Sequence, residues 1–164
     1  MVTGAPSNSL WDDLCKRSEK VNGELVVFAY GALVSQVSLD YPDPQEASKQ
    51  LDRIGMNIGH RIIEDFLSKA ISVGAFGLNG TYPKGDLKCI CEYLKQAFRY
   101  YLSSSVVISI PSEPIDQEQK EEAILTLDQN PFQQHVELPI HLKDGLIYSA
   151  VLCGIIRGSL EMLQ

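Results

Sequence analysis

The apolar positions of the chain predict two long helices in its N-terminal half. Residues 24–41, ELVVFAYGALVSQVSLDY, start like a strand with Val26 and Val27, but the length of the segment and its Ala, Gly, Leu and Gln content favour a helix. This helix is apolar almost all round, which is typical of a helix buried on more than one side. After a break at YPDPQ, residues 43–70 predict a second helix, with acidic residues in its first turn and Lys69 in its last.

The remainder of the chain mixes loop, helix and strand patterns. Four glycines and a proline mark residues 71–86 as a loop. The later predicted elements are a helix at 87–103, strands at 106–110 and 122–128, a turn with an extended arm at 130–139, and an apolar helix at 146–164. The sequence therefore predicts an α+β fold in which helices pack with a small antiparallel sheet.

Two glycines, Gly55 and Gly59, lie inside the second predicted helix, one turn apart. An interior glycine costs a helix roughly 1 kcal/mol relative to alanine, so the pair indicates that another helix backbone comes unusually close. The helix at 24–41 is the natural neighbour for this glycine face, and we predict that the two pack together.

Composition and charge limit the function classes. The chain has 164 residues, 45% of them hydrophobic, so it can bury a core of ordinary size. Its formal net charge of −7 leaves no basic excess to meet phosphates, which argues against nonspecific binding to nucleic acid or anionic lipid. The first ten residues lack a signal-peptide pattern, and no apolar run reaches the roughly 20 residues needed to span a bilayer. We therefore expect a cytoplasmic protein.

The candidate catalytic and metal-binding residues form no constellation in the sequence. His60, His135 and His141 share no metal-type spacing, and we interpret them as structural or surface residues. Cys89 and Cys91 have too few His and Cys neighbours for a zinc site. No nucleophile elbow, P-loop or dinucleotide fingerprint is present. The sequence thus predicts no catalytic residue and no metal site.

Four sequence blocks, taken in order, resemble one protein family. They are YGALVSQ at 30–36, LDRIGMNIGHRIIEDFL at 51–67, NPFQQHVELP at 130–139 and LIYSAVLCGIIRGSLEMLQ at 146–164. Together they look like the successive blocks of the TRAPP (transport protein particle) subunit-three family, the Bet-three type. The resemblance runs from about Glu24 to the last residue and is weak in 71–86 and 103–125. Four ordered blocks are far more specific than any single motif.

This resemblance implies a function without local chemistry. Family members are small α/β-plait subunits of a vesicle-tethering complex that acts between the endoplasmic reticulum and the Golgi, and the assembled complex is a nucleotide-exchange factor for a Rab-type GTPase. We therefore expect a homodimer or a heteromer with related TRAPP subunits, contact with the GTPase through the assembled complex, and peripheral association with Golgi and endoplasmic reticulum membranes. We also expect one TRAPP-like domain at 24–164, after a flexible N-terminal extension at 1–23.

The resemblance also assigns a partner interface. Family members pair through their first two helices, so we expect the outer apolar faces of 24–41 and 43–70 to meet a partner subunit. The alternative is that the glycines serve only a contact within the chain. The predicted interface residues are Phe28, Tyr30, Gly31, Leu33, Gly55, Met56 and Gly59.

A second implied feature is an internal apolar channel. In the family, a cysteine in a valine-glycine-x-cysteine context takes a fatty acyl chain into this channel, but here the position holds Phe76, so no acylation site is predicted. We expect Phe76 to plug the channel, the alternative being that it lies on the surface. The predicted channel residues are Phe66, Ile71, Phe76 and Leu78.

A binding function from another class is the alternative. Sensor domains of the same general architecture bind small molecules or fatty acids, so fold-level likeness alone does not decide the function. We predict no cofactor, and a bound fatty acid is left open as an alternative that we do not predict. An enzyme is the third reading, and it ranks last because the sequence lacks a triad, a metal set or a cofactor loop.

Overall fold

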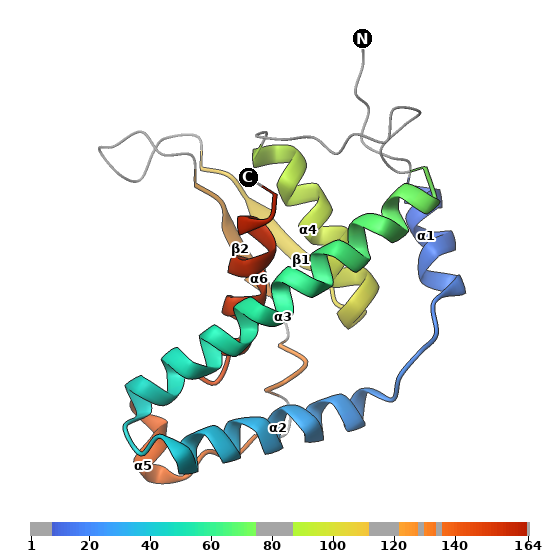
Figure 1. The fold of residues 1–164 in the computed structure, drawn as a ribbon. Coiled ribbons are helices and arrows are strands. Elements are labelled where there is room, and N and C mark those ends of the chain that lie inside the picture. Colours follow the sequence, from blue (N-terminus) through green and yellow to red (C-terminus); the bar gives the residue numbers. More distant parts are fainter. Residues whose placement is uncertain (1–7, 75–86, 112–121, 128–129, 134–135, 164) are drawn as a thin grey trace. The chain divides into compact units, whose positions relative to one another are not determined.

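A computed structural model describes residues 8–74, 87–111, 122–127, 130–133 and 136–163 (Figure 1). The elements in chain order are α1 (Asn8–Arg17), α2 (Gly23–Asp40), α3 (Pro44–Ser72), α4 (Leu87–Leu102), β1 (Val106–Ser109), β2 (Ile124–Leu127), α5 (Ile140–Lys143) and α6 (Ala150–Glu161). Helices with one small antiparallel sheet confirm the predicted α+β class. The chain divides into two compact units. The first unit holds α1, the end of α3 from Phe66 onward, α4 and both strands, and the second holds α2, α3 up to Asp65, α5 and α6.

Helices α2 and α3 begin and end at recognisable sequence signals. The Asn22 side chain caps α2, because its Oδ1 accepts a hydrogen bond from the backbone N–H of Glu24 at 2.8 Å. Pro44 is the first residue of α3. A backbone N–H at this position would have no partner within the helix, so the missing N–H of proline costs no hydrogen bond. Beyond the end of α3, Gly74 takes a φ of +74°, the left-handed conformation that commonly terminates helices. Both predicted helices are confirmed to within two residues at each end.

In the first unit, aromatic side chains hold the helices together. The ring of Trp11 on α1 stacks on Phe66 with 5.3 Å between centroids, and Tyr93 on α4 meets the Trp11 ring edge-on at 6.3 Å. Helix α4 also packs against β1. The two strands pair antiparallel, with Val106 opposite Leu127, which confirms the predicted strand pair.

In the second unit, the core forms around Tyr30 of α2. Its ring stacks on Phe132 with 4.6 Å between centroids and meets Tyr148 edge-on at 5.0 Å, and its hydroxyl donates a hydrogen bond to the backbone carbonyl oxygen of Tyr148. The segment before α6 is also tied to α3, since the backbone N–H of Ile147 donates to Ser48 Oγ at 2.9 Å. These contacts join α2 and α3 to the chain's C-terminal part.

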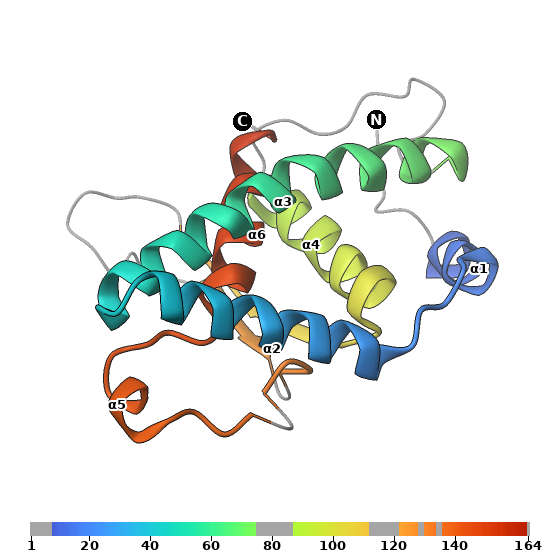
Figure 2. The same ribbon diagram turned by 60° about the horizontal axis from the view of Figure 1, so that its bottom comes forward.

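The glycines of α3 pack against α6, and Figures 1 and 2 both show α6 crossing α3. The glycines at this crossing are Gly55 and Gly59 on α3 and Gly154 and Gly158 on α6. A Cβ at Gly55 would lie 2.2 Å from the carbonyl oxygen of Val151, and a Cβ at Gly154 would lie 2.1 Å from that of Asp52. The two backbones therefore touch on both sides, and neither helix has room for a methyl group there.

The prediction that helix 24–41 packs on the glycine face is wrong. The nearest atoms at both Gly55 and Gly59 belong to α6, not to α2. The spacing of the glycines showed that a backbone comes close but carried no information on which helix supplies it. The matching signal was the second pair, Gly154 and Gly158, which repeats the four-residue spacing in the last helix.

Candidate partner-binding surface

Helix α2 carries apolar side chains on two opposite faces. Its buried positions are Tyr30, Val34 and Val37, which we call the inner stripe. On the other face, the exposed positions Leu25, Phe28, Ala32, Ser35 and Leu39 recur at steps of three and four, and we call them the outer stripe. Steps of three and four keep side chains on one face of a helix. Two apolar faces explain why the sequence of α2 is apolar almost all round.

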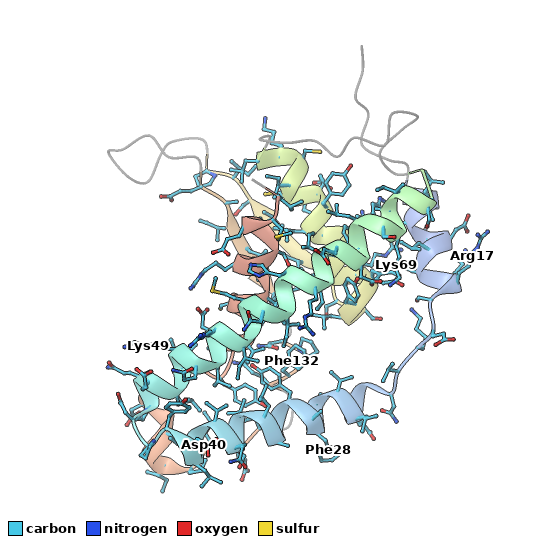
Figure 3. The ribbon with its side chains drawn as sticks, in the orientation of Figure 1. Arg17, Phe28, Asp40, Lys49, Lys69 and Phe132 are labelled. Carbon is cyan, nitrogen blue, oxygen red and sulfur yellow. The ribbon has the colours of Figure 1, made fainter. Side chains whose placement is uncertain are left out.

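The outer stripe exposes its large side chains to water. Phe28 is 76% exposed, Leu39 73% and Leu25 62%. Figure 3 shows Phe28 pointing away from the side of α2 on which Phe132 lies. Each such side chain forgoes roughly 1.5 to 3 kcal/mol of burial free energy while it stays in water. An aligned row of exposed apolar side chains is typical of a protein interface.

The structure separates the seven predicted interface residues. Phe28 is the exposed centre of the outer stripe, whereas Tyr30 is buried on the opposite face. Gly31 and Leu33 are half-buried, and Met56 is half-buried with its backbone atoms against α6. Gly55 and Gly59 are covered by α6, as described above. A partner role for these residues stays a prediction, and the geometry favours Phe28.

The predicted channel residues have different environments. Phe66 is only 1% exposed, and the neighbour that stacks on it is Trp11 from α1. Ile71 is 51% exposed at the end of α3. Phe76 and Leu78 lie outside the described residues, so the predicted plug stays a prediction. Sequence reasoning missed Trp11, although it is the only tryptophan of the chain and lies three residues before Leu14 in a short amphipathic pattern.

Polar side chains around the α3–α6 crossing form one exposed ion pair and one exposed histidine–carboxylate contact. Arg157 donates to Asp52 at 2.8 Å, and His60 Nε2 lies 3.1 Å from a carboxylate oxygen of Glu161. Exposed pairs of this kind contribute about 0 to 1 kcal/mol. His60 thus lies in a partly exposed contact at the surface of the crossing. His135 lies outside the described residues.

Burial changes the acid–base behaviour of the tyrosines. Burial, with smaller contributions from Cys89, raises the pKa of Tyr93 to about 12 from its ordinary value of 10.0. Burial also raises the pKa of Tyr30 and of Tyr148. All three phenols therefore stay protonated and neutral at neutral pH.

Metal-binding clusters and membrane-spanning helices are both absent from the described residues. These residues contain no group of three or more His, Cys, Asp or Glu side chains that could hold a metal ion. Among the same residues, no helix has both the length and the apolar character that crossing a membrane requires. Among these residues, we take the outer stripe of α2 as the candidate partner-binding surface because its large apolar side chains are exposed.

Comparison with known proteins identifies the family. The sequence profile of the transport protein particle (TRAPP) component family matches residues 26–164. The chain belongs to the TRAPP component family. It is 38% identical to transport protein particle subunit bet3 of Schizosaccharomyces pombe over 159 residues, which cover 96% of this chain and 78% of the relative. This confirms the resemblance drawn from the four sequence blocks.

Two further TRAPP relatives match nearly the whole chain. Trafficking protein particle complex subunit 3 of Dictyostelium discoideum is 36% identical over 158 residues, which cover 96% of this chain and 77% of the relative. Trafficking protein particle complex subunit BET3 of Saccharomyces cerevisiae is 35% identical over 162 residues, which cover 98% and 75%. The matched region includes α2 and therefore the outer stripe.

Proposed function

We propose that the chain is a non-catalytic core subunit of a TRAPP-type tethering complex that acts in transport between the endoplasmic reticulum and the Golgi. The relatives are named as subunits of a trafficking particle, and the family profile spans residues 26–164. The assembled complex provides the surface that exchanges nucleotide on a Rab-type GTPase, and this chain helps to form that surface. The chain is cytoplasmic and is held through the complex at Golgi and endoplasmic reticulum membranes.

The single observation that carries this proposal is the outer stripe of α2. A helix that is held in place by its inner stripe and exposes Phe28, Leu25 and Leu39 on the other side is incomplete as a monomer. The steps of three and four suit a helix of a second subunit, which buries such a row as knobs between its own side chains. We assign this surface to pairing with a related TRAPP subunit.

A pull-down of co-expressed subunits tests the assignment. The chain is tagged and co-expressed with each related TRAPP subunit of the same organism, and the partners that co-purify are identified. Phe28→Lys places a charge in the outer stripe, and Ile71→Lys is the matched control, because Ile71 is a 51% exposed apolar residue near the end of α3. Lysine near a helix C-terminus is also well tolerated there.

The expected result is that the wild-type chain and Ile71→Lys retain a related subunit while Phe28→Lys loses it. Truncation of a central aromatic residue in an interface commonly costs at least about 2 kcal/mol of binding, or roughly thirtyfold in affinity. Retention of the subunit by Phe28→Lys would remove the outer stripe from the proposal. Failure of the wild-type chain to retain any related subunit would contradict the proposed function itself.

We also propose that the chain carries no covalent acyl group. At the position that the family resemblance matches to the acylated cysteine, this chain has Phe76, whose side chain cannot form a thioester. The intact mass of protein made in a eukaryotic host should then equal that of the bare polypeptide. A fatty acyl adduct on Cys89 or Cys91 would contradict this expectation.

A further inference from the structure

Helix α1 is attached to the first unit through a small set of side chains on its docked face. Trp11 is 1% exposed and lies flat on Phe66, with 5° between the ring planes, and Leu14 is 8% exposed. Beside them, the carboxylate of Asp12 accepts from the guanidinium of Arg99 on α4. The docked face of α1 thus consists of about one helical turn, in which the Trp11 ring stacks, the Asp12 carboxylate pairs with Arg99, and Leu14 is buried.

These contacts must also supply the stability of α1 itself. The helix has ten residues, fewer than the roughly 12 to 15 below which isolated helices are marginal in water. Its other face exposes Asp13, Lys16 and Arg17, and residues 19–22, which lead on to α2, are exposed as well. We therefore expect α1 to unfold when it undocks, and this local opening to need less free energy than global unfolding.

The surface beneath α1 has its own chemistry. It consists of the rings of Phe66 and Tyr93, with Arg99 at the rim and Tyr101 next to Phe66 at 6.4 Å between centroids. These rings can pack against an aromatic residue of an amphipathic helix, and the Arg99 cation can pair with a carboxylate next to that residue. Recognition of a helix in an apolar groove follows this pattern of a few anchor residues on one helix face.

We propose that this surface, formed by the end of α3 and by α4, is a docking site for an amphipathic helix of a partner protein that carries a carboxylate next to an aromatic residue, and that α1 is its built-in competitor. Helix α1 shows what the ligand must carry. An aromatic residue takes the place of Trp11, a carboxylate follows it to meet Arg99, and an aliphatic residue comes three positions after the aromatic one. The site shares no residue with the outer stripe of α2, so the proposal does not rest on the proposed function.

A labelled peptide measures access to the site. The probe is fluorescein-labelled NSLWDDLSKRS, residues 8–18 with Cys15 replaced by serine, and binding is followed by fluorescence anisotropy. The full-length Trp11→Ala chain, whose α1 has lost its anchor, should bind the probe at least about tenfold more tightly than the wild-type chain, in which the tethered α1 competes at high effective concentration. A probe in which alanine replaces tryptophan is the control and should not bind.

A charge exchange tests the rim of the site. In the Trp11→Ala chain, Arg99→Glu should weaken the probe by up to about fivefold, as expected for an exposed ion pair, and a probe with Asp12→Arg should restore the loss. Equal binding of the probe by the wild-type and Trp11→Ala chains, or no binding by either, would overturn the proposal. A wild-type dimer that needs Trp11 to form would also overturn it, because the site would then hold the α1 of a second copy.

A second measurement needs no variant and covers the case in which Trp11→Ala does not fold. Trp11 is the only tryptophan, so its emission reports the position of α1 directly. An unlabelled probe with Trp11→Phe, which is silent at tryptophan wavelengths, is added to the wild-type chain. The expected result is a saturable red shift as α1 is displaced into water, and emission that stays unchanged up to millimolar probe would contradict a displaceable α1.

Discussion

At the scale of single residues, the four glycines at the α3–α6 crossing determine how closely two backbones approach. The Cβ of Gly55→Ala would lie 2.2 Å from a backbone oxygen, and a backbone cannot move aside as a flexible side chain can. We expect Gly55→Ala to lower the free energy of unfolding by about 3 kcal/mol, the upper end of the usual overpacking cost. Denaturant titration followed by circular dichroism measures the change.

Gly31→Ala is the matched control for this prediction. Gly31 also lies inside a helix, but nothing lies within 4 Å of the position that its Cβ would occupy. The substitution should raise the free energy of unfolding by about 0.5 to 1 kcal/mol, because alanine is the better helix former. Opposite signs at the two glycines are expected, and equal losses would show that the crossing is not the cause.

The buried tyrosines predict how stability depends on alkaline pH. Since burial raises the pKa of Tyr93 from 10.0 to about 12, its phenol stays protonated longer in the folded chain than in the unfolded chain. Its contribution is complete below pH 10 and is lost as the pH rises to about 12. The free energy of unfolding should therefore fall over this window, and Tyr93→Phe should make the fall less steep. An identical slope for the variant would contradict the assignment.

At the scale of elements, the outer stripe predicts self-association of the purified chain. Without a partner subunit, Leu39 and Phe28 can leave water only by meeting another copy. Light scattering at micromolar concentration should show species larger than a monomer, and Leu39→Lys should shift them towards the monomer. Val34→Lys, on the inner stripe, should instead unfold the chain, because it buries a charge. A monodisperse wild-type monomer would contradict this prediction.

The elements also show how far the sequence alone could be interpreted. The bounds of α2, α3 and α4 and the pairing of the two strands follow from apolar period and turn residues, which act within a few positions of the chain. Helix α1 was missed because ten residues give too short a period, and its stability comes from Trp11 meeting Phe66, which is distant in sequence. The partner of the glycine face was misassigned because it also depends on a contact between residues that are distant in sequence. Local patterns indicate the elements, whereas their neighbours depend on long-range packing.

The candidate surface was predictable in a similar, partial way. An almost uniformly apolar helix at 24–41 indicated burial on two sides, and the structure places Phe28, one of the predicted interface residues, on the exposed outer stripe. Tyr30, two residues later, points to the opposite face, since successive side chains on a helix are about 100° apart. The sequence could not tell these faces apart, because both are apolar.

At the scale of the whole molecule, the remaining question is whether this chain can exchange nucleotide by itself. An exchange factor must bind the nucleotide-free GTPase more tightly than the nucleotide-bound GTPase, because a protein that binds both forms equally does not shift the equilibrium between them. We assign the exposed apolar side chains of the outer stripe to pairing with a subunit, and under the proposed function contact with the GTPase then belongs to the assembled complex.

We therefore expect the isolated chain to leave the nucleotide off-rate of the Rab-type GTPase unchanged. Release of a fluorescent guanine nucleotide is measured for the GTPase alone, with the chain at stoichiometric amounts, and with the complex reconstituted from the chain and its related subunits. The complex should accelerate release. A complex prepared with Phe28→Lys should lose the acceleration through failed assembly, whereas Ile71→Lys should keep it. Acceleration by the isolated chain would mean that a single subunit distinguishes the two GTPase states, and the outer stripe would then have to be tested as a GTPase contact.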